Sequence, residues 1–121
     1  MALNDIPIYL GIIGFITMGI GSFFLPERVT SQFDISTLST AGRNEVRAVY
    51  SGFGILMGLM LITALNAPLL RSGICITIAA ALAGMAIGRI LSTVLDRHID
   101  GWPLFYMCLE IVLATAIVLA A

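Results

Sequence analysis

Four long apolar stretches run through the chain, separated by short polar connections. The hydrocarbon core of a bilayer is about 30 Å thick, and about 20 residues of apolar helix cross it. The chain has 121 residues, so four such helices use most of it and leave no room for a separate soluble domain. The pattern predicts an all-α, up-down-up-down four-helix transmembrane bundle. It would form a single integral membrane domain over 1–121, with helices over 6–25, 43–66, 71–95 and 102–121.

All six basic residues are arginines, and the net charge of the chain is −1. A nucleic-acid-binding surface needs a concentration of positive charge that this chain lacks. We therefore expect no nucleic-acid partner, and we expect the membrane lipid bilayer to surround the protein.

The arginines flank the predicted helices unequally. Short connections make successive helices antiparallel, so the 26–42 connection and the 96–101 turn share one face of the membrane. Four arginines lie at that face against one at the other, namely Arg28, Arg43, Arg47 and Arg97 against Arg71. The positive-inside rule then predicts that both chain termini lie outside the cytoplasm.

Two opposite charges lie deep inside predicted membrane helices, Arg89 in the third and Glu110 in the fourth. A charge at the bilayer centre costs about 2.5–3.5 kcal/mol, so such residues face a partner or a polar cavity. At about 1.5 Å of helix per residue, both lie roughly 10–12 Å below the same membrane face. Because the two helices are antiparallel neighbours, we expect the two side chains to pair.

Polar residues of the second helix are expected to complete this cluster. Intervals of three and four put Arg47 and Tyr50 on one helix face, and Arg47 can reach downward along its stem. Two arginines beside one deep glutamate leave surplus positive charge, which suits an amphiphilic, lipid-like ligand such as a quinone. In the alternative interpretation, the Arg–Glu pair only fixes how the helices are arranged. The predicted ligand-binding residues are Glu45, Arg47, Tyr50, Arg89 and Glu110.

Small residues recur at four-residue spacing in two helices. Gly54 and Gly58 form a GxxxG pattern in the second helix, and Ala80, Gly84 and Gly88 form a similar ladder in the third. Small residues at this spacing let helix backbones approach closely in lipid. The pattern indicates either contact between the second and third helices of one bundle or the seam of a homodimer.

The residue types that metal and catalytic sites need are scarce. Cys75 and Cys108 are predicted at different depths on neighbouring helices, so we expect two buried thiols with no disulfide. The single histidine, His98, lies in the turn before the fourth helix. No metal site and no catalytic set is predicted, and an enzyme would need a cofactor, of unknown identity, from outside the chain.

The connection between the first and second helices is the longest in the chain. Pro26 can occupy the first turn of a short helix. The spacing of Val29 and Phe33 then predicts an apolar stripe that lies against the membrane surface.

The second helix opens with the sequence Asn44-Glu45-Val46-Arg47-Ala48-Val49-Tyr50-Ser51-Gly52. It resembles the motif N-E-[IV]-R-A-x-Y-[GS]-G of a bacterial family of small four-helix membrane proteins of unknown function. Arg89 and Glu110 match the arginine and the glutamate that this family carries in helices three and four. The layout also resembles DoxX-like proteins, four-helix membrane proteins linked to quinol oxidase or thiol-redox complexes. These resemblances imply a multi-pass protein of the bacterial cytoplasmic (inner) membrane.

The sequence leaves several functions open. A small membrane protein that binds a lipid- or quinone-like ligand in the arginine and glutamate pocket is the first. An accessory subunit that docks by its glycine faces into a larger membrane complex is the second, and a proton-coupled small carrier is the third. The carrier would need Glu110 to exchange protons near neutral pH, which neighbouring arginines oppose.

Overall fold

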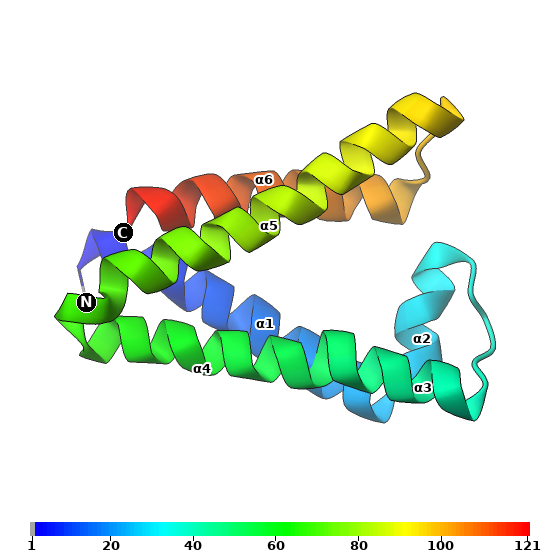
Figure 1. Ribbon diagram of the computed structural model, residues 1–121, viewed down its shortest axis with the longest axis horizontal. Helices are drawn as coiled ribbons and strands as arrows, with labels where there is room; N and C mark the ends of the chain where they lie inside the picture. Colours follow the sequence, from blue (N-terminus) through cyan, green and yellow to red (C-terminus); the bar gives the residue numbers. More distant parts are fainter. Residues whose placement is uncertain (1) are drawn as a thin grey trace.

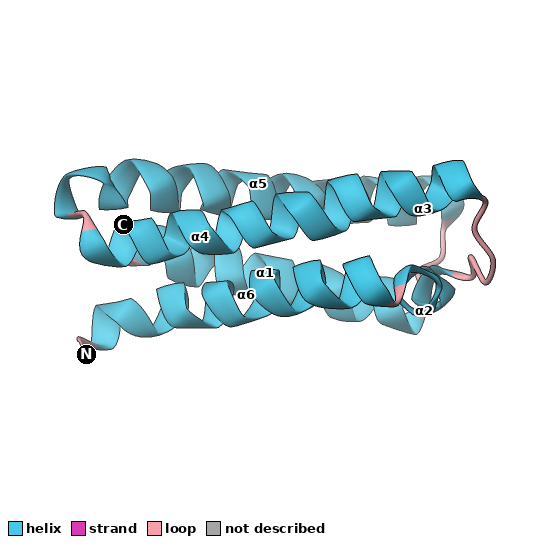
Figure 2. Ribbon diagram, turned by 90° about the horizontal axis from the view of Figure 1, so that it is seen from below, coloured by secondary structure: helices cyan, strands magenta, loops and turns pink. Residues whose placement is uncertain are grey.

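The computed structural model describes residues 2–121, and in that range it contains helices, turns and loops but no strand (Figure 2). A segment with π-helical hydrogen bonding, η3, joins α3 to α4 without a break, so these three elements form the second of four long helices. The predicted all-α four-helix architecture is confirmed. The elements in chain order are η1 (Leu3–Asp5), α1 (Ile6–Phe24), α2 (Pro26–Thr30), η2 (Ser31–Phe33), α3 (Thr40–Val46), η3 (Arg47–Gly52), α4 (Phe53–Asn66), α5 (Pro68–Asp96) and α6 (Gly101–Leu119).

The four long helices alternate in direction along one axis (Figure 1). Both chain termini and the turn between α4 and α5 lie at one end of the bundle, which we call the terminal end. The α1–α3 connection and the α5–α6 turn lie at the other, the loop end. Each long helix is long and apolar enough to span a membrane, as expected of a multi-pass membrane protein. Large apolar side chains accordingly cover much of the outer surface.

Two helices begin three residues earlier than the apolar pattern predicts. The second long helix begins at Thr40 because the Ser39 hydroxyl oxygen accepts a hydrogen bond from the Gly42 amide at 3.0 Å, which caps the helix. Helix α5 begins at Pro68, because proline has no amide proton to leave unpaired in a first turn.

The core is formed by inward faces of all four long helices. Helix α1 packs mainly against α4, and α5 packs mainly against α6. Cys75 lies in this core, whereas Cys108 is exposed on the outside of α6, so the prediction of two buried thiols is wrong for Cys108. Both cysteines are free, as expected. The most deeply buried apolar residues are Ile8, Leu61, Ala64, Cys75 and Ile117.

The glycines of the second and third long helices have different surroundings. A Cβ atom on Gly54 would lie 3.0 Å from the Phe15 carbonyl oxygen, and one on Gly58 would lie 2.6 Å from Ile16, both on α1. A Cβ on Gly84 or Gly88 would meet nothing within 4 Å. The predicted glycine contact between the second and third helices is therefore wrong, because the close neighbour of Gly54 and Gly58 is α1.

The η3 segment shifts the buried face of the second long helix by one residue. The buried positions run from Val46 to Ser51 and then to Gly54 and Gly58, so the first step is five residues and the next are three and four. An i to i+5 hydrogen-bonding pattern accommodates one extra residue in that turn. As a result, Ser51 is buried and Tyr50, which a regular α-helix would place on the buried face, is exposed.

Arg71 ties the terminal end together. Its guanidinium group donates hydrogen bonds to the carboxylate of Asp5 at 2.7 Å, to the Asn4 carbonyl oxygen at 3.1 Å and to the Ala120 carbonyl oxygen at 3.0 Å. One side chain of α5 thus joins both ends of the chain to the α4–α5 turn.

Candidate functional site

Arg89 of α5 and Glu110 of α6 form the expected ion pair. Arg89 Nε lies 3.0 Å from Glu110 Oε1 and 3.1 Å from Oε2, and a terminal guanidinium nitrogen lies 3.0 Å from Oε1. The Glu110 side chain is only 8% exposed. Both carboxylate oxygens accept hydrogen bonds from a single guanidinium group, so the buried Glu110 charge is paired with the partly exposed Arg89.

Aromatic rings from two elements cover the Arg89 guanidinium. Its central carbon lies 5.9 Å from the centre of the Phe33 ring of η2 and 5.7 Å from that of Tyr106 of α6. The Tyr106 hydroxyl donates a hydrogen bond to Gln32 Oε1 at 2.8 Å, which fixes η2 against α6. Phe33 was predicted to lie on an apolar stripe against the membrane surface, but its ring lies beside the ion pair, over the Arg89 guanidinium. The segment α2–η2 therefore reaches from the end of α1 to α6.

This cluster is balanced in charge and in hydrogen bonding. One guanidinium faces one carboxylate, and the rings of Phe33 and Tyr106 occupy the space beside them. Buried ion pairs of this kind contribute modestly to net stability but can select one arrangement of helices. The geometry accordingly suits a role in aligning α5, α6 and η2.

Arg47, the first residue of η3, lies at the end of α1. Its Nε donates a hydrogen bond to the Phe23 carbonyl oxygen at 3.0 Å, and its guanidinium lies 5.3 Å from the centre of the Phe23 ring. The helix breaks between α1 and α2, where Pro26 begins the next helix. Carbonyls in the last turn of a helix have no partner within that helix and carry partial negative charge. Arg47 therefore caps the carboxyl end of α1.

Three arginines and one carboxylate line a hollow at the loop end, which we call the arginine hollow. Its volume is about 330 Å³, and its walls come from the α1–α2 junction and the start of the second long helix. Arg43 lies 3.6 Å from Glu27 and donates hydrogen bonds to the Leu38 carbonyl oxygen at 2.9 Å and to Thr40 Oγ1 at 3.2 Å. With three positive charges against one negative, the hollow carries a surplus of two. Its lining residues are Phe24, Leu25, Pro26, Glu27, Arg28, Arg43 and Arg47.

The structure separates the five residues that sequence analysis grouped into one site. Arg89 and Glu110 are together. Arg47 lies in the arginine hollow and bonds to α1. Glu45 and Tyr50 are exposed, and within residues 2–121 neither forms a hydrogen bond or ion pair with the other three.

A family described as a domain of unknown function, DUF4345, matches residues 5–121. The chain belongs to this family. The predicted resemblance to a family of unknown function is confirmed at this level. No curated protein and no solved structure matches the chain.

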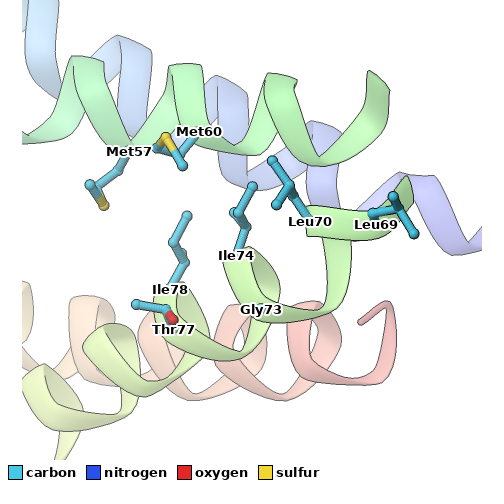
Figure 3. Close-up of a pocket in the computed structure, with 8 residues that line it drawn as sticks. All are labelled: Met57, Met60, Leu69, Leu70, Gly73, Ile74, Thr77 and Ile78. Carbon is cyan, nitrogen blue, oxygen red and sulfur yellow. The ribbon is translucent and has the colours of Figure 1, made fainter. Parts of the chain in front are cut away.

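This DUF4345 chain has a second hollow, of about 390 Å³, between α4 and α5 (Figure 3). Side chains such as Met57, Ile74 and Ile78 enter it, and Thr77 contributes the single polar side chain among its lining residues. It lies toward the α4–α5 turn, whereas the arginine hollow lies at the loop end. One head group therefore cannot occupy both. The lining residues are Met57, Met60, Leu69, Leu70, Gly73, Ile74, Thr77 and Ile78.

Several residues of the ion-pair cluster and of the arginine hollow in this DUF4345 chain were not among the predicted ligand-binding residues. Tyr106 precedes Glu110 by one helical turn, and this spacing placed the two residues on one helix face, but Tyr106 was not among the predicted ligand-binding residues. Arg28 was counted only as a determinant of membrane orientation, and Arg43 shared a helix face with Arg47 but was not among the predicted ligand-binding residues. Gln32 and Phe33 carried no signal that links them to α6, because nothing in the local pattern specifies where a long connection folds back.

Proposed function

We propose that this protein is a small membrane protein that binds an amphiphilic molecule, with the polar head of that molecule in the arginine hollow. The observation that carries the proposal is the excess of guanidinium groups over carboxylates in this hollow. Arg28 and Arg47 are exposed, so their charges are open to an added polar head, and charge-assisted hydrogen bonds to such a head would be favourable. The ligand class is the one that sequence analysis predicts, but the proposed site is at a different place in the bundle.

The surroundings of the hollow suit the apolar part of such a ligand. Phe24, which lines the hollow, is 72% exposed on the outside of α1, and Leu25 beside it is half exposed. In a membrane these side chains would face acyl chains. A ligand could thus bind its head to the arginines while its tail stays in the bilayer.

Of the five residues predicted from sequence, we assign only Arg47 to this site. Arg89 and Glu110 align the helices in this proposal, and Glu45 and Tyr50 lie outside the hollow. We also propose the bacterial cytoplasmic membrane as the location. The likeness to DoxX-like proteins stays a prediction about architecture and carries no ligand with it.

Native mass spectrometry of the protein extracted from host membranes in a mild detergent tests this function. We expect a discrete added mass of a few hundred daltons or more on the wild-type chain, reduced in an Arg28→Gln/Arg43→Gln variant. Arg97→Gln is the matched control, because Arg97 follows the last residue of α5 at the loop end and does not line the hollow. Absence of any bound amphiphile from the wild-type chain would contradict the proposal.

The open face of α5 favours a second candidate function, an accessory subunit of a larger membrane complex or a homodimer. A side-chain carbon added at Gly84 or Gly88 would have no neighbour within 4 Å, so another helix could approach there. Gly84→Leu should then abolish co-purification of the partner without unfolding the chain. Unchanged association would contradict this candidate.

The carrier hypothesis gains no support, because both carboxylate oxygens of Glu110 are bonded to Arg89.

A further inference from the structure

We infer that the arginine hollow selects the phosphate of an anionic phospholipid in the leaflet at the loop end. The inference rests on the proposed function and names the ligand class for the same site. It is drawn from the charge, the free hydrogen-bond donors and the position of the hollow.

Charge is the first step. Arg28, Arg43 and Arg47 outnumber Glu27, the one carboxylate in the lining. The Arg43–Glu27 pair is 3.6 Å apart and both side chains are more than a third exposed, so it neutralises the hollow only weakly. A quinone ring brings no negative charge to such a site, whereas a phosphate brings at least one. The surplus therefore favours phosphate over an uncharged head.

The available donors give the second step. The Nε atom of Arg47 is used by the Phe23 carbonyl oxygen, and both terminal nitrogens of Arg43 bond to the 38–40 segment. Among the described residues, no hydrogen bond or ion pair involves the guanidinium of Arg28, and none involves the terminal nitrogens of Arg47. Planar guanidinium groups bind phosphate oxygens through two parallel hydrogen bonds. Arg28 and Arg47 are therefore the residues that would contact the phosphate.

Preorganisation strengthens this assignment. Arg43 and Arg47 are each held by a backbone carbonyl oxygen, at 2.9 Å and 3.0 Å. Side chains that are already ordered lose less conformational entropy when a ligand binds. The hollow thus presents two fixed positive charges and one free arginine.

Position decides between a lipid and a free phosphate. The hollow lies where α1 ends and the second long helix begins, at the loop end of the bundle (Figure 1). Phe24 and Leu25 form an apolar wall on its outer side. A dissolved phosphate gains nothing from that wall, whereas a phospholipid can lay its acyl chains along it. Anionic lipids also concentrate in the cytoplasmic leaflet, where the arginine-rich end is expected to lie.

Delipidated protein in detergent, titrated with phosphatidylglycerol or phosphatidylcholine of identical acyl chains, tests the inference by native mass spectrometry. We expect the wild-type chain to retain phosphatidylglycerol about tenfold more strongly, because both lipids offer the same phosphate but the positive choline group of phosphatidylcholine opposes the surplus positive charge of the hollow. Arg28→Gln should remove most of this preference, and Arg97→Gln should leave it unchanged. Inorganic phosphate at millimolar concentration should not displace the lipid.

Four results would overturn the inference. Equal retention of the two lipids would show that the hollow does not distinguish an anionic head group from a zwitterionic one. Equal losses in Arg28→Gln and Arg97→Gln would show a diffuse surface effect, and displacement by inorganic phosphate would identify a site for a soluble anion. An uncharged amphiphile that co-purifies from host membranes and depends on Arg28 and Arg43 would preserve the proposed function while refuting the phosphate assignment.

Discussion

Arg47 Nε donates a hydrogen bond to the carbonyl oxygen of Phe23, 3.0 Å away across 24 residues of sequence. The same guanidinium lies over the Phe23 ring. Arg47, in the second long helix, therefore donates a hydrogen bond to a carbonyl oxygen in the last turn of α1 and also lines the arginine hollow. Structural and proposed binding roles meet in this side chain, and separate measurements are needed to tell them apart.

Arg47→Gln should lower the free energy of unfolding by about 1–2 kcal/mol, because it removes a charged donor from the carboxyl end of α1. Thermal or denaturant unfolding in detergent measures the loss. Arg97→Gln, an exposed position at the same end, should change stability by less than about 0.5 kcal/mol. Equal effects of the two substitutions would show that the bond to Phe23 does not stabilise the protein.

Removing one member of the deep ion pair should be costly. Arg89→Gln leaves the buried Glu110 carboxylate without its partner, with an expected loss of about 3–5 kcal/mol. Glu110→Gln should cost less, because the Arg89 side chain that it leaves unpaired is 27% exposed. The double variant should lose clearly less than the sum of the two, since no isolated charge remains. A double-mutant cycle by thermal unfolding gives the coupling. Additive losses would mean that the pair does not act as a unit.

The contact between η2 and α6 can be tested without disturbing the ring that covers Arg89. Tyr106→Phe keeps the ring and removes the hydroxyl that bonds Gln32 at 2.8 Å. We expect a loss of about 1 kcal/mol, together with faster proteolytic cleavage of the 31–39 connection. Gln32→Ala should give the same increase in cleavage, and combining both changes should add little. Unchanged cleavage in both variants would contradict the idea that this bond anchors η2.

The effect of a glycine substitution on stability should depend on whether the glycine faces a neighbouring helix of the bundle. Gly54→Leu places a side chain where a Cβ atom alone would already lie 3.0 Å from the Phe15 carbonyl oxygen, so α1 and α4 must separate. We expect a loss of several kcal/mol or failure to fold, the usual result of overpacking against backbone. Gly84→Leu, on the open face of α5, should leave the unfolding temperature of the isolated chain unchanged. The opposite ranking would show that α1 is not the neighbour of Gly54.

The terminal-end network predicts unequal losses from its two charged members. Asp5→Asn removes one partner of Arg71, whereas Arg71→Gln also breaks the hydrogen bonds to the Asn4 and Ala120 carbonyl oxygens. We expect Arg71→Gln to destabilise the protein by about 1 kcal/mol more than Asp5→Asn. Unfolding in detergent at fixed pH, with Arg97→Gln as the control, measures both. Equal losses would mean that the two backbone contacts contribute nothing.

The amino-acid sequence by itself determined the four long helices, the sidedness of their connections and the Arg89–Glu110 pair. Apolar run length specifies how many helices cross a bilayer, because the thickness of the hydrocarbon core is fixed. Depth follows from the constant rise per residue, and the short turn between α5 and α6 makes them neighbours. A pair at equal depth on adjacent helices was therefore predictable.

Only the tertiary structure decided which helix each face of the second long helix meets. Periodicity gives the angle of a side chain around its own axis but does not name the neighbour at that angle. The one extra residue in the η3 turn rotates the following residues by about 100° relative to a regular helix, which buries Ser51 and exposes Tyr50. Arg47 and Gly54 meet α1, and η2 folds back onto α6, because these contacts depend on long-range packing that no local pattern encodes.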